Sequence, residues 1–315
     1  MTRLEIVNFV CDKVGKTDLN SKEKCASFVK RRYEMIYDSA LWKDSLVMAP
    51  TMTANSDKLV LPYAIQRVVA VRWNVTELAP VDQSLLLRVD PEIFERSGTP
   101  SRFSEMTPVG VSVLPASAER LNFVSSNSSD TNITILIRGE LSNVEQVETV
   151  TLNGTTTVSS TKSWDVIYTL SKQETAGTVT VTGFTSGTTY LTLWDVESER
   201  KYARIRLHEI PSDTSKSILV LGKRRLRQLD NDLDTPLIRN IDNAIIAYVQ
   251  GDMLELGRQY GKAQTKYQEG GAMLEQAKLV EVFQSAYLQQ VIPTTSGEWS
   301  IDDIVSGGLS GKAYF

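Results

Sequence analysis

The chain has 315 residues, of which 41% are hydrophobic and 23% are charged, so it can bury a sizeable core in roughly two or three folded units. Its formal net charge of −4 at pH 7 excludes a strong overall attraction to nucleic acid or to an anionic membrane. No apolar run approaches the roughly 20 residues that cross a bilayer, and charges at Arg3, Glu5 and Asp12 argue against a signal peptide.

Residues 1–48 are predicted to form two N-terminal helices. Apolar side chains recur at helical spacing up to Gly15, which can end the first helix. Asn20 is the expected N-cap of a second, more strongly amphipathic helix that runs to Trp42. The pair forms a helical hairpin, and we expect another part of the chain to cover its apolar faces.

The two cysteines, Cys11 and Cys25, fall within these helical patterns. A secreted chain this rich in strands would often carry disulfides, so we expect both to be buried free thiols in a reducing compartment.

Residues 49–143 change to a β-rich pattern. Short runs of apolar residues, including 65–75 and 84–90, alternate with Ser, Asn and Gly turns, and Asn55-Ser56-Asp57 is typical of a hairpin turn. This spacing predicts a curled sheet or a β-sandwich.

Residues 144–210 are richer in Thr, Val, Ser and Gly and contain five or six strand-like runs. They predict a small immunoglobulin-like β-domain, inserted between the first sheet and the helices that follow. Trp164 and Tyr168 fit inward positions of such a sandwich.

Residues 211–291 are predicted to contain the long C-terminal helices, which pack with residues 1–48 as a helical bundle. Thr235 is the expected N-cap, Pro236 suits the first helical position, and a break is expected near Gly270-Gly271. Together the segments predict an α+β fold.

A heptad seam runs through this helical region. Its two series of positions lack polar side chains, which is the pattern of helices that pack along one another, either within one chain or against another. The positions are Ile246, Met253, Tyr260, Tyr267 and Leu274, with Val249, Leu256, Ala263, Gly270 and Ala277.

Residues 292–315 are predicted to form an extended C-terminal tail. The segment is rich in Gly and Ser, yet it is too apolar for a purely solubilising segment, and an exposed apolar segment usually awaits a partner surface. Val305 adds to its apolar character, and the candidate partner-binding residues are Trp299, Ile301, Ile304, Leu309, Tyr314 and Phe315.

No catalytic or metal site can be assembled from the sequence, so we expect neither enzymatic activity nor a cofactor. His208 is the only histidine, and it is expected on a sheet surface without catalytic companions. Asp230, Asp232 and Asp234 begin like a calcium loop, but the required Gly and Glu are replaced further along, so they are interpreted as an acidic lead-in to a helix.

A basic run is formed by Lys223, Arg224, Arg225 and Arg227. The simpler interpretation is a solvated or ion-paired surface. The alternative is contact with a DNA backbone, which needs only clustered cations.

Three stretches resemble those of the head-to-tail connector, or adaptor, proteins of tailed bacteriophages. They are Phe28–Glu34 followed by Ala40-Leu41-Trp42, then Gly98–Phe103, and finally Asp232–Ile238 ahead of the long helix. The order of helices, sheet and long C-terminal helices is also similar to that family. The immunoglobulin-like insertion departs from its smallest members.

The resemblance implies a virion structural protein, made in the host cytoplasm and located in the neck between head and tail. Such a protein forms a homo-oligomeric ring, usually of about twelve copies, that docks on the portal protein and is joined below by tail or nozzle proteins. The candidate residues of the C-terminal tail would then bind the portal or a neighbouring subunit. Packaged DNA passes in non-specific proximity, and no membrane is involved.

Two other classes stay open. One is a different phage tail or baseplate structural protein. The other is a carbohydrate-binding adhesin module in residues 144–210, which would need a cluster of exposed aromatics, although Trp164 and Trp194 are the only tryptophans there. A hydrolase is the most distant alternative.

Overall fold

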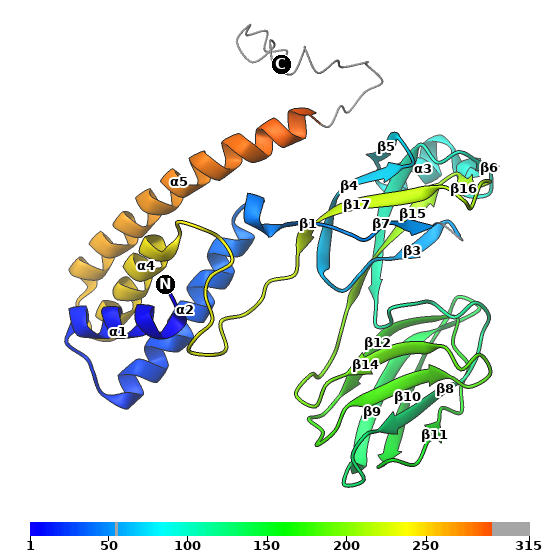
Figure 1. Ribbon diagram of the computed structural model, residues 1–315, viewed down its shortest axis with the longest axis horizontal. Coiled ribbons are helices and arrows are strands. Elements are labelled where there is room, and N and C mark those ends of the chain that lie inside the picture. The colour runs from blue at the N-terminus through cyan, green and yellow to red at the C-terminus, as the bar shows by residue number, and fades with distance from the viewer. Residues whose placement is uncertain (54–55, 292–315) are drawn as a thin grey trace, which may run out of the picture. The chain divides into compact units, whose positions relative to one another are not determined.

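The computed structural model describes residues 1–53 and 56–291, with side chains described up to residue 280. The described residues contain five α-helices and many strands in curled sheets, so the predicted α+β class is confirmed (Figure 1). One unit combines residues 1–46 with the chain from residue 223 onward, and the other comprises residues 47–222. Among the described helices, none is both long and apolar enough to cross a membrane.

The helices of the first unit come from both ends of the chain. The C-terminal helices thus supply the partner surface that the apolar faces of the N-terminal helices need. A shared apolar core joins them and includes Trp42, Tyr33 and Ile245, all fully buried, together with both free cysteines. The elements are α1 (Arg3–Val14), α2 (Leu19–Asp38), the 3-10 turn η1 (Lys43–Ser45), α4 (Asp242–Leu256) and α5 (Tyr260–Val291).

Local signals define the ends of α1 and α2. A reciprocal capping box between Thr2 and Glu5 begins α1, and Gly15, at φ 71°, ends it. The N-cap of α2 is Asp18, whose carboxylate accepts from the backbone N–H of Ser21, so the helix begins before the predicted Asn20.

The segment that precedes α4 is not helical, contrary to the prediction that a helix begins at Thr235. The backbone carbonyls of Asp232 and Asp234 accept hydrogen bonds from Leu4 and Arg3 at 3.1 and 2.8 Å, and so satisfy N–H groups at the start of α1. The acidic residues therefore belong to a loop that holds α1 rather than to a helical lead-in. The helix α4 begins only at Asp242.

The heptad seam is buried within one chain, between α4 and α5. The chain reverses at residues 257–259, where Arg258 has φ 59°, and α5 continues through the expected break at Gly270-Gly271. Leu256 and Tyr260 are 47% and 64% exposed because they flank this reversal. The other seam positions are buried or half-buried.

Close approach between α4 and α5 depends on glycine. A Cβ on Gly251 would lie 2.5 Å from Cε1 of Tyr267, whose hydroxyl is bonded to Asp252 and Glu255 and cannot easily withdraw. We expect Gly251→Ala to lower the free energy of unfolding by about 1–3 kcal/mol in a urea titration followed by circular dichroism. Gly261→Ala is the matched control, because no atom lies within 4 Å of its Cβ position, and it should be neutral or stabilising.

The second unit contains a mixed sheet with strand order β1-β17-β4-β5-β7-β15-β3, and β2 pairs with β17 (Figure 1). Its core includes Ile65, Val71 and Ile205, which are fully buried. The strands are β1 (Leu46–Met48), β2 (Met52–Thr53), β3 (Lys58–Val60), β4 (Ile65–Trp73), β5 (Thr76–Pro80), β7 (Arg102–Val109), β15 (Tyr202–His208) and β17 (Ser217–Arg224).

Shorter elements connect these strands. Residues 84–90, predicted as a strand, belong mainly to a helix that Asp82 caps by accepting from the N–H of Ser84. The elements are α3 (Gln83–Val89), the 3-10 turn η2 (Pro91–Phe94), and the parallel pair β6 (Ser97–Gly98) and β16 (Ile210–Pro211).

Two further sheets, β10-β9-β12 and β11-β8-β13-β14, contribute to one apolar cluster around Trp164 and Phe123. All their pairings are antiparallel. The strands are β8 (Leu121–Ser125), β9 (Thr131–Leu141), β10 (Val144–Asn153), β11 (Val158–Ser159), β12 (Val166–Lys172), β13 (Val179–Gly183) and β14 (Thr189–Leu193).

These pairings cross the predicted boundaries of the insertion at residues 144 and 210. The turn at Ser142-Asn143, with φ 52° and 64°, joins β9 to β10 as a tight hairpin, so the turn signal there does not separate two domains. At the other end, β15 pairs with β7 and β3 of the first sheet although it precedes residue 210.

Candidate functional site

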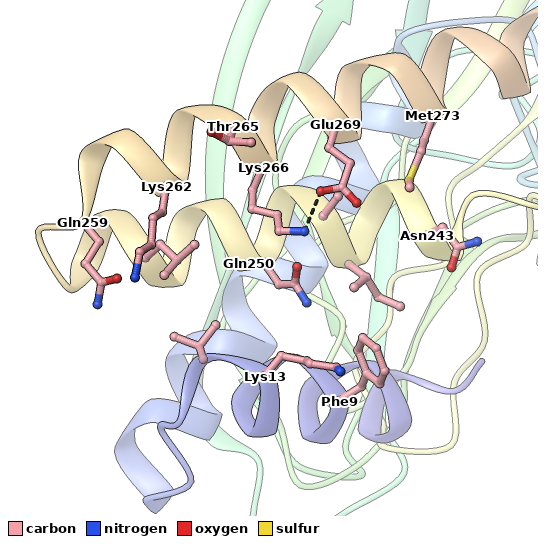
Figure 2. A pocket seen from close by; sticks show the side chains of 14 residues that line it. Phe9, Lys13, Asn243, Gln250, Gln259, Lys262, Thr265, Lys266, Glu269 and Met273 are labelled. Carbon is pink, nitrogen blue, oxygen red and sulfur yellow. Dashed lines mark hydrogen bonds and ion pairs between the residues drawn. The ribbon is translucent and has the colours of Figure 1, made fainter.

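A groove of about 790 Å³ lies between α1, α4 and α5 of the first unit, which is called the helical unit below (Figure 2). Its apolar lining comes from all three helices, which the shared core holds together. Apolar residues that line it are Phe9, Val14, Ile246, Ala247, Leu254 and Met273.

Lysines from two helices give the groove a basic rim. Lys262 and Lys266 of α5 point toward α1, and Lys13 of α1 lies on the opposite side with its Nζ 5.6 Å from the ring centroid of Phe9 (Figure 2). Lys266 also forms an ion pair of 2.5 Å with Glu269. The groove thus combines apolar surface with positive charge, which suits a partner that presents both apolar and acidic side chains.

A smaller hollow of about 200 Å³ extends the groove along α5. The two share Asn243 and Met273, and the extension is also lined by Arg239, Ala277 and Val280. The resulting surface follows α5 for much of its length, which is the shape required for an extended or helical peptide segment.

A polar cluster on another face of α4 fixes the α4–α5 pair against α2. The guanidinium of Arg32 binds the carboxylate of Asp252, with Nε to Oδ2 at 2.8 Å, and lies 5.2 Å from the ring centroids of both Tyr248 and Tyr267. The hydrogen bond to Asp252 raises the pKa of Arg32. Burial, together with hydrogen bonds to Glu255 and Asp252, raises the pKa of Tyr267.

The basic run does not form one exposed patch. Lys223 is buried, its Nζ donates to the carbonyl of Tyr37 at 2.9 Å, and it lies 4.4 Å from that ring's centroid. Arg227 is exposed and pairs with Asp234 at 3.2 Å, Arg224 is also exposed, and Arg225 is half-buried. Lys223 is therefore removed from the candidates for DNA contact.

The position of Lys223 makes a specific prediction. Lys223→Gln should lower the free energy of unfolding by about 1–2 kcal/mol, because the Tyr37 carbonyl loses a charged donor and the ring loses its cation. A melt of the purified variant measures this loss. If stability were unchanged, the lysine would not serve the packing role assigned to it.

His208 is buried, contrary to the prediction of a surface position. Its Nε2 is 2.9 Å from Oγ of Ser104, and its ring makes an edge contact with Phe94. Burial, with the nearby charge of Arg206, lowers the pKa of His208 to about 4, so the side chain is neutral at pH 7. It fills a polar position in the sheet core.

Two buried carboxylates were not anticipated from the sequence. Glu119 accepts from the N–H groups of Thr185 and Ser186 and from the hydroxyl of Tyr190. Asp130 accepts from the N–H groups of Ala176 and Gly177. Apart from the hydroxyl of Ser125, which also donates to Asp130, these donors lie 46 to 71 residues away in the chain, so sequence patterns did not mark either position. Both carboxylates join loops of the second unit, residues 47–222, which is called the β-rich unit below.

The remaining predicted site residues belong to the C-terminal tail. Trp299, Ile301, Ile304, Leu309, Tyr314 and Phe315 lie outside the described residues. In the part of the chain that is described, no cluster of three or more His, Cys, Asp or Glu side chains could hold a metal ion.

Comparisons with known proteins do not identify a family. No protein-family model matches the chain, and no curated protein is significantly similar to it.

Proposed function

We propose that this chain is a virion structural protein that assembles as a head-to-tail adaptor ring, docks on a portal protein and links it to tail components. The observation that carries the proposal is the open groove between α1, α4 and α5, with its apolar lining and basic rim. Such a surface suits the binding of protein segments.

The positions of the adaptor-like segments support this assignment. Phe28–Glu34 lies on α2, and Trp42 is buried in the same core. The Asp232–Ile238 segment holds the start of α1 through its carbonyls and donates from Leu237 N–H to the hydroxyl of Tyr33 at 2.9 Å. Two of the three segments therefore belong to the helical unit that carries the groove.

The finer architecture follows from the same proposal. The helical unit is a bundle, built from both ends of the chain, that faces the portal. The antiparallel sheets of β8–β14 enclose Trp164 and form an immunoglobulin-like domain, which would contact downstream tail or nozzle proteins. The packaged genome passes nearby without specific recognition, and the chain has no catalytic role.

Binding to portal rings tests the proposal directly. The purified protein should form a complex with portal rings that is visible by electron microscopy, and particles that lack it should lose tails and packaged DNA. Particles that kept both would overturn the assignment. Location in another part of the tail would instead support a tail or baseplate role.

A carbohydrate-binding role has one favourable observation. Trp194 is 57% exposed, whereas Trp164 is fully buried in the core of the β-rich unit. Phe184 is also exposed, but its ring is covered in part by Arg120, whose guanidinium lies 3.9 Å from the ring centroid. Binding of the full chain to a glycan array, lost in Trp194→Ala, would favour this second candidate.

A further inference from the structure

We propose that the groove between α1, α4 and α5 binds residues 298–305 of a second copy of this chain. No part of the chain within residues 1–53 or 56–280 fills the groove, which leaves Phe9 42% exposed at its edge. The inference deepens the proposed function and rests on it for the role of the contact in a ring.

The chemistry of the two surfaces is complementary. Residues 298–305 read EWSIDDIV and therefore contain three acidic residues among four large apolar residues. The groove offers Lys13, Lys262 and Lys266 at its rim, Arg239 in its extension, and a single acidic lining residue, Glu269. Opposite charge at the rim would set the register of the segment, while burial of apolar surface would provide most of the affinity.

The spacing of the apolar residues suits a groove. Ile301, Ile304 and Val305 recur at the i, i+3, i+4 positions typical of anchors in peptides that bind as a helix in a groove. Glu298 and Asp302, four residues apart, fall along one edge of the face that carries the anchors, so in that binding mode they would meet the lysines of the rim, whereas Asp303 would point away from the groove.

Chain length favours a second copy over the chain's own segment. The groove lies along α5 toward its N-terminal end, and the chain leaves the groove at the Val280 end. From Lys266 to Val291 the helix rises by roughly 37 Å, at about 1.5 Å per residue. Residues 292–302 span at most roughly 36–40 Å when fully extended. Asp302 could reach its own Lys266 only with no length left for the reversal of direction.

A contact of this kind joins different surfaces of two copies. Such head-to-tail contacts close into rings when the rotation between copies permits. Each copy would donate one segment and receive another, so the assembly would depend equally on the segment and on the groove.

Removal of residues 292–315 from the full protein tests the donor. Analytical ultracentrifugation should show self-association in the full chain and a loss of about tenfold or more in association of the truncated protein. A labelled synthetic peptide of residues 296–308 should bind the truncated protein, as measured by fluorescence anisotropy, and should dissociate more readily at high salt.

Charge reversal tests the groove. Lys262→Glu with Lys266→Glu should weaken peptide binding by about tenfold, whereas Lys24→Glu, an exposed change on α2 outside the groove, should not. A peptide carrying Glu298→Lys and Asp302→Lys should restore binding to the charge-reversed groove.

Three results would overturn the inference. They are equal peptide binding by the groove and control variants, self-association that persists after truncation, and a monomeric full chain that binds peptide only after truncation, which would indicate that the segment occupies its own groove. These readouts need no portal. If the protein self-associated as expected but did not bind portal rings, that result would contradict the proposed function and not this inference.

Discussion

Glu119→Ala is expected to lower the free energy of unfolding of the β-rich unit by about 3 kcal/mol at neutral pH. Glu119 is 7% exposed, and its carboxylate accepts hydrogen bonds from the N–H of Thr185, from the N–H and hydroxyl of Ser186 and from the hydroxyl of Tyr190, so its removal leaves four donor groups without their acceptor. Because these donors lie on or beside the loop between β13 and β14, the loss should loosen that end of the sheet.

The pH dependence of the same variant checks the mechanism. Burial alone would raise the pKa of Glu119, but hydrogen bonds from Tyr190, Ser186 and Thr185 lower it from an ordinary 4.5 to about 2. The folded state therefore binds this proton less readily than the unfolded state. The contribution to stability is fully present above pH 4.5 and is lost as the pH falls toward 2.

Denaturant titrations at a series of pH values would measure this trend. The difference between the natural protein and Glu119→Ala should shrink through the acid range, while Glu145→Ala, an exposed change on β10, should stay within about 0.5 kcal/mol at every pH. A difference that did not vary with pH would contradict the role of the charged carboxylate.

Local periodicity predicted most helices but not all their ends. The seam of Ile246 to Ala277 correctly indicated helices packed along one another, because heptad spacing directly reports a buried stripe. It could not show that the chain reverses at residues 257–259, since the same stripe serves one long helix or two antiparallel ones. Thr235-Pro236 has the composition of a helix start, yet its segment makes tertiary hydrogen bonds to α1 and α2 instead.

Burial of polar residues was the harder property to predict. His208 has the alternating neighbours of a surface strand, but Ser104 and Phe94 from distant segments enclose it. Lys223 belongs to a run of cations that is typical of an exposed patch, but the carbonyl and ring of Tyr37, with the carboxylate of Asp38 at 3.4 Å, explain its burial. In each case the decisive partner is far away in the chain, so single-sequence patterns contain no signal for it.

The candidate groove illustrates the same limit. Its residues come from α1, α4 and α5, and none of them forms a motif in the sequence. The apolar character of residues 292–315 is evident from composition, whereas the lysine-rimmed groove depends on three helices that lie far apart in the chain.

Disruption of the cluster around Arg32 should weaken the helical unit that carries this groove. Asp252→Ala leaves the guanidinium of Arg32 without its carboxylate and removes one acceptor from the Tyr267 hydroxyl, so a loss of about 2–3 kcal/mol in the free energy of unfolding is expected. Arg32→Ala should cost a similar amount, because it also removes the cation between Tyr248 and Tyr267.

The double variant separates a true interaction from two independent losses. If Arg32 and Asp252 act as a pair, the double variant should be less destabilised than the sum of the single variants by about 1–3 kcal/mol. Glu275→Ala is the matched control, because it removes an exposed i, i+3 pair with Lys278 on α5 and should change stability by less than about 0.5 kcal/mol. Additive losses at Arg32 and Asp252 would contradict the pairing. Because Asp252 and the groove residue Gln250 share α4, coupled losses that also weaken peptide binding would mean that the Arg32 cluster fixes the shape of the groove.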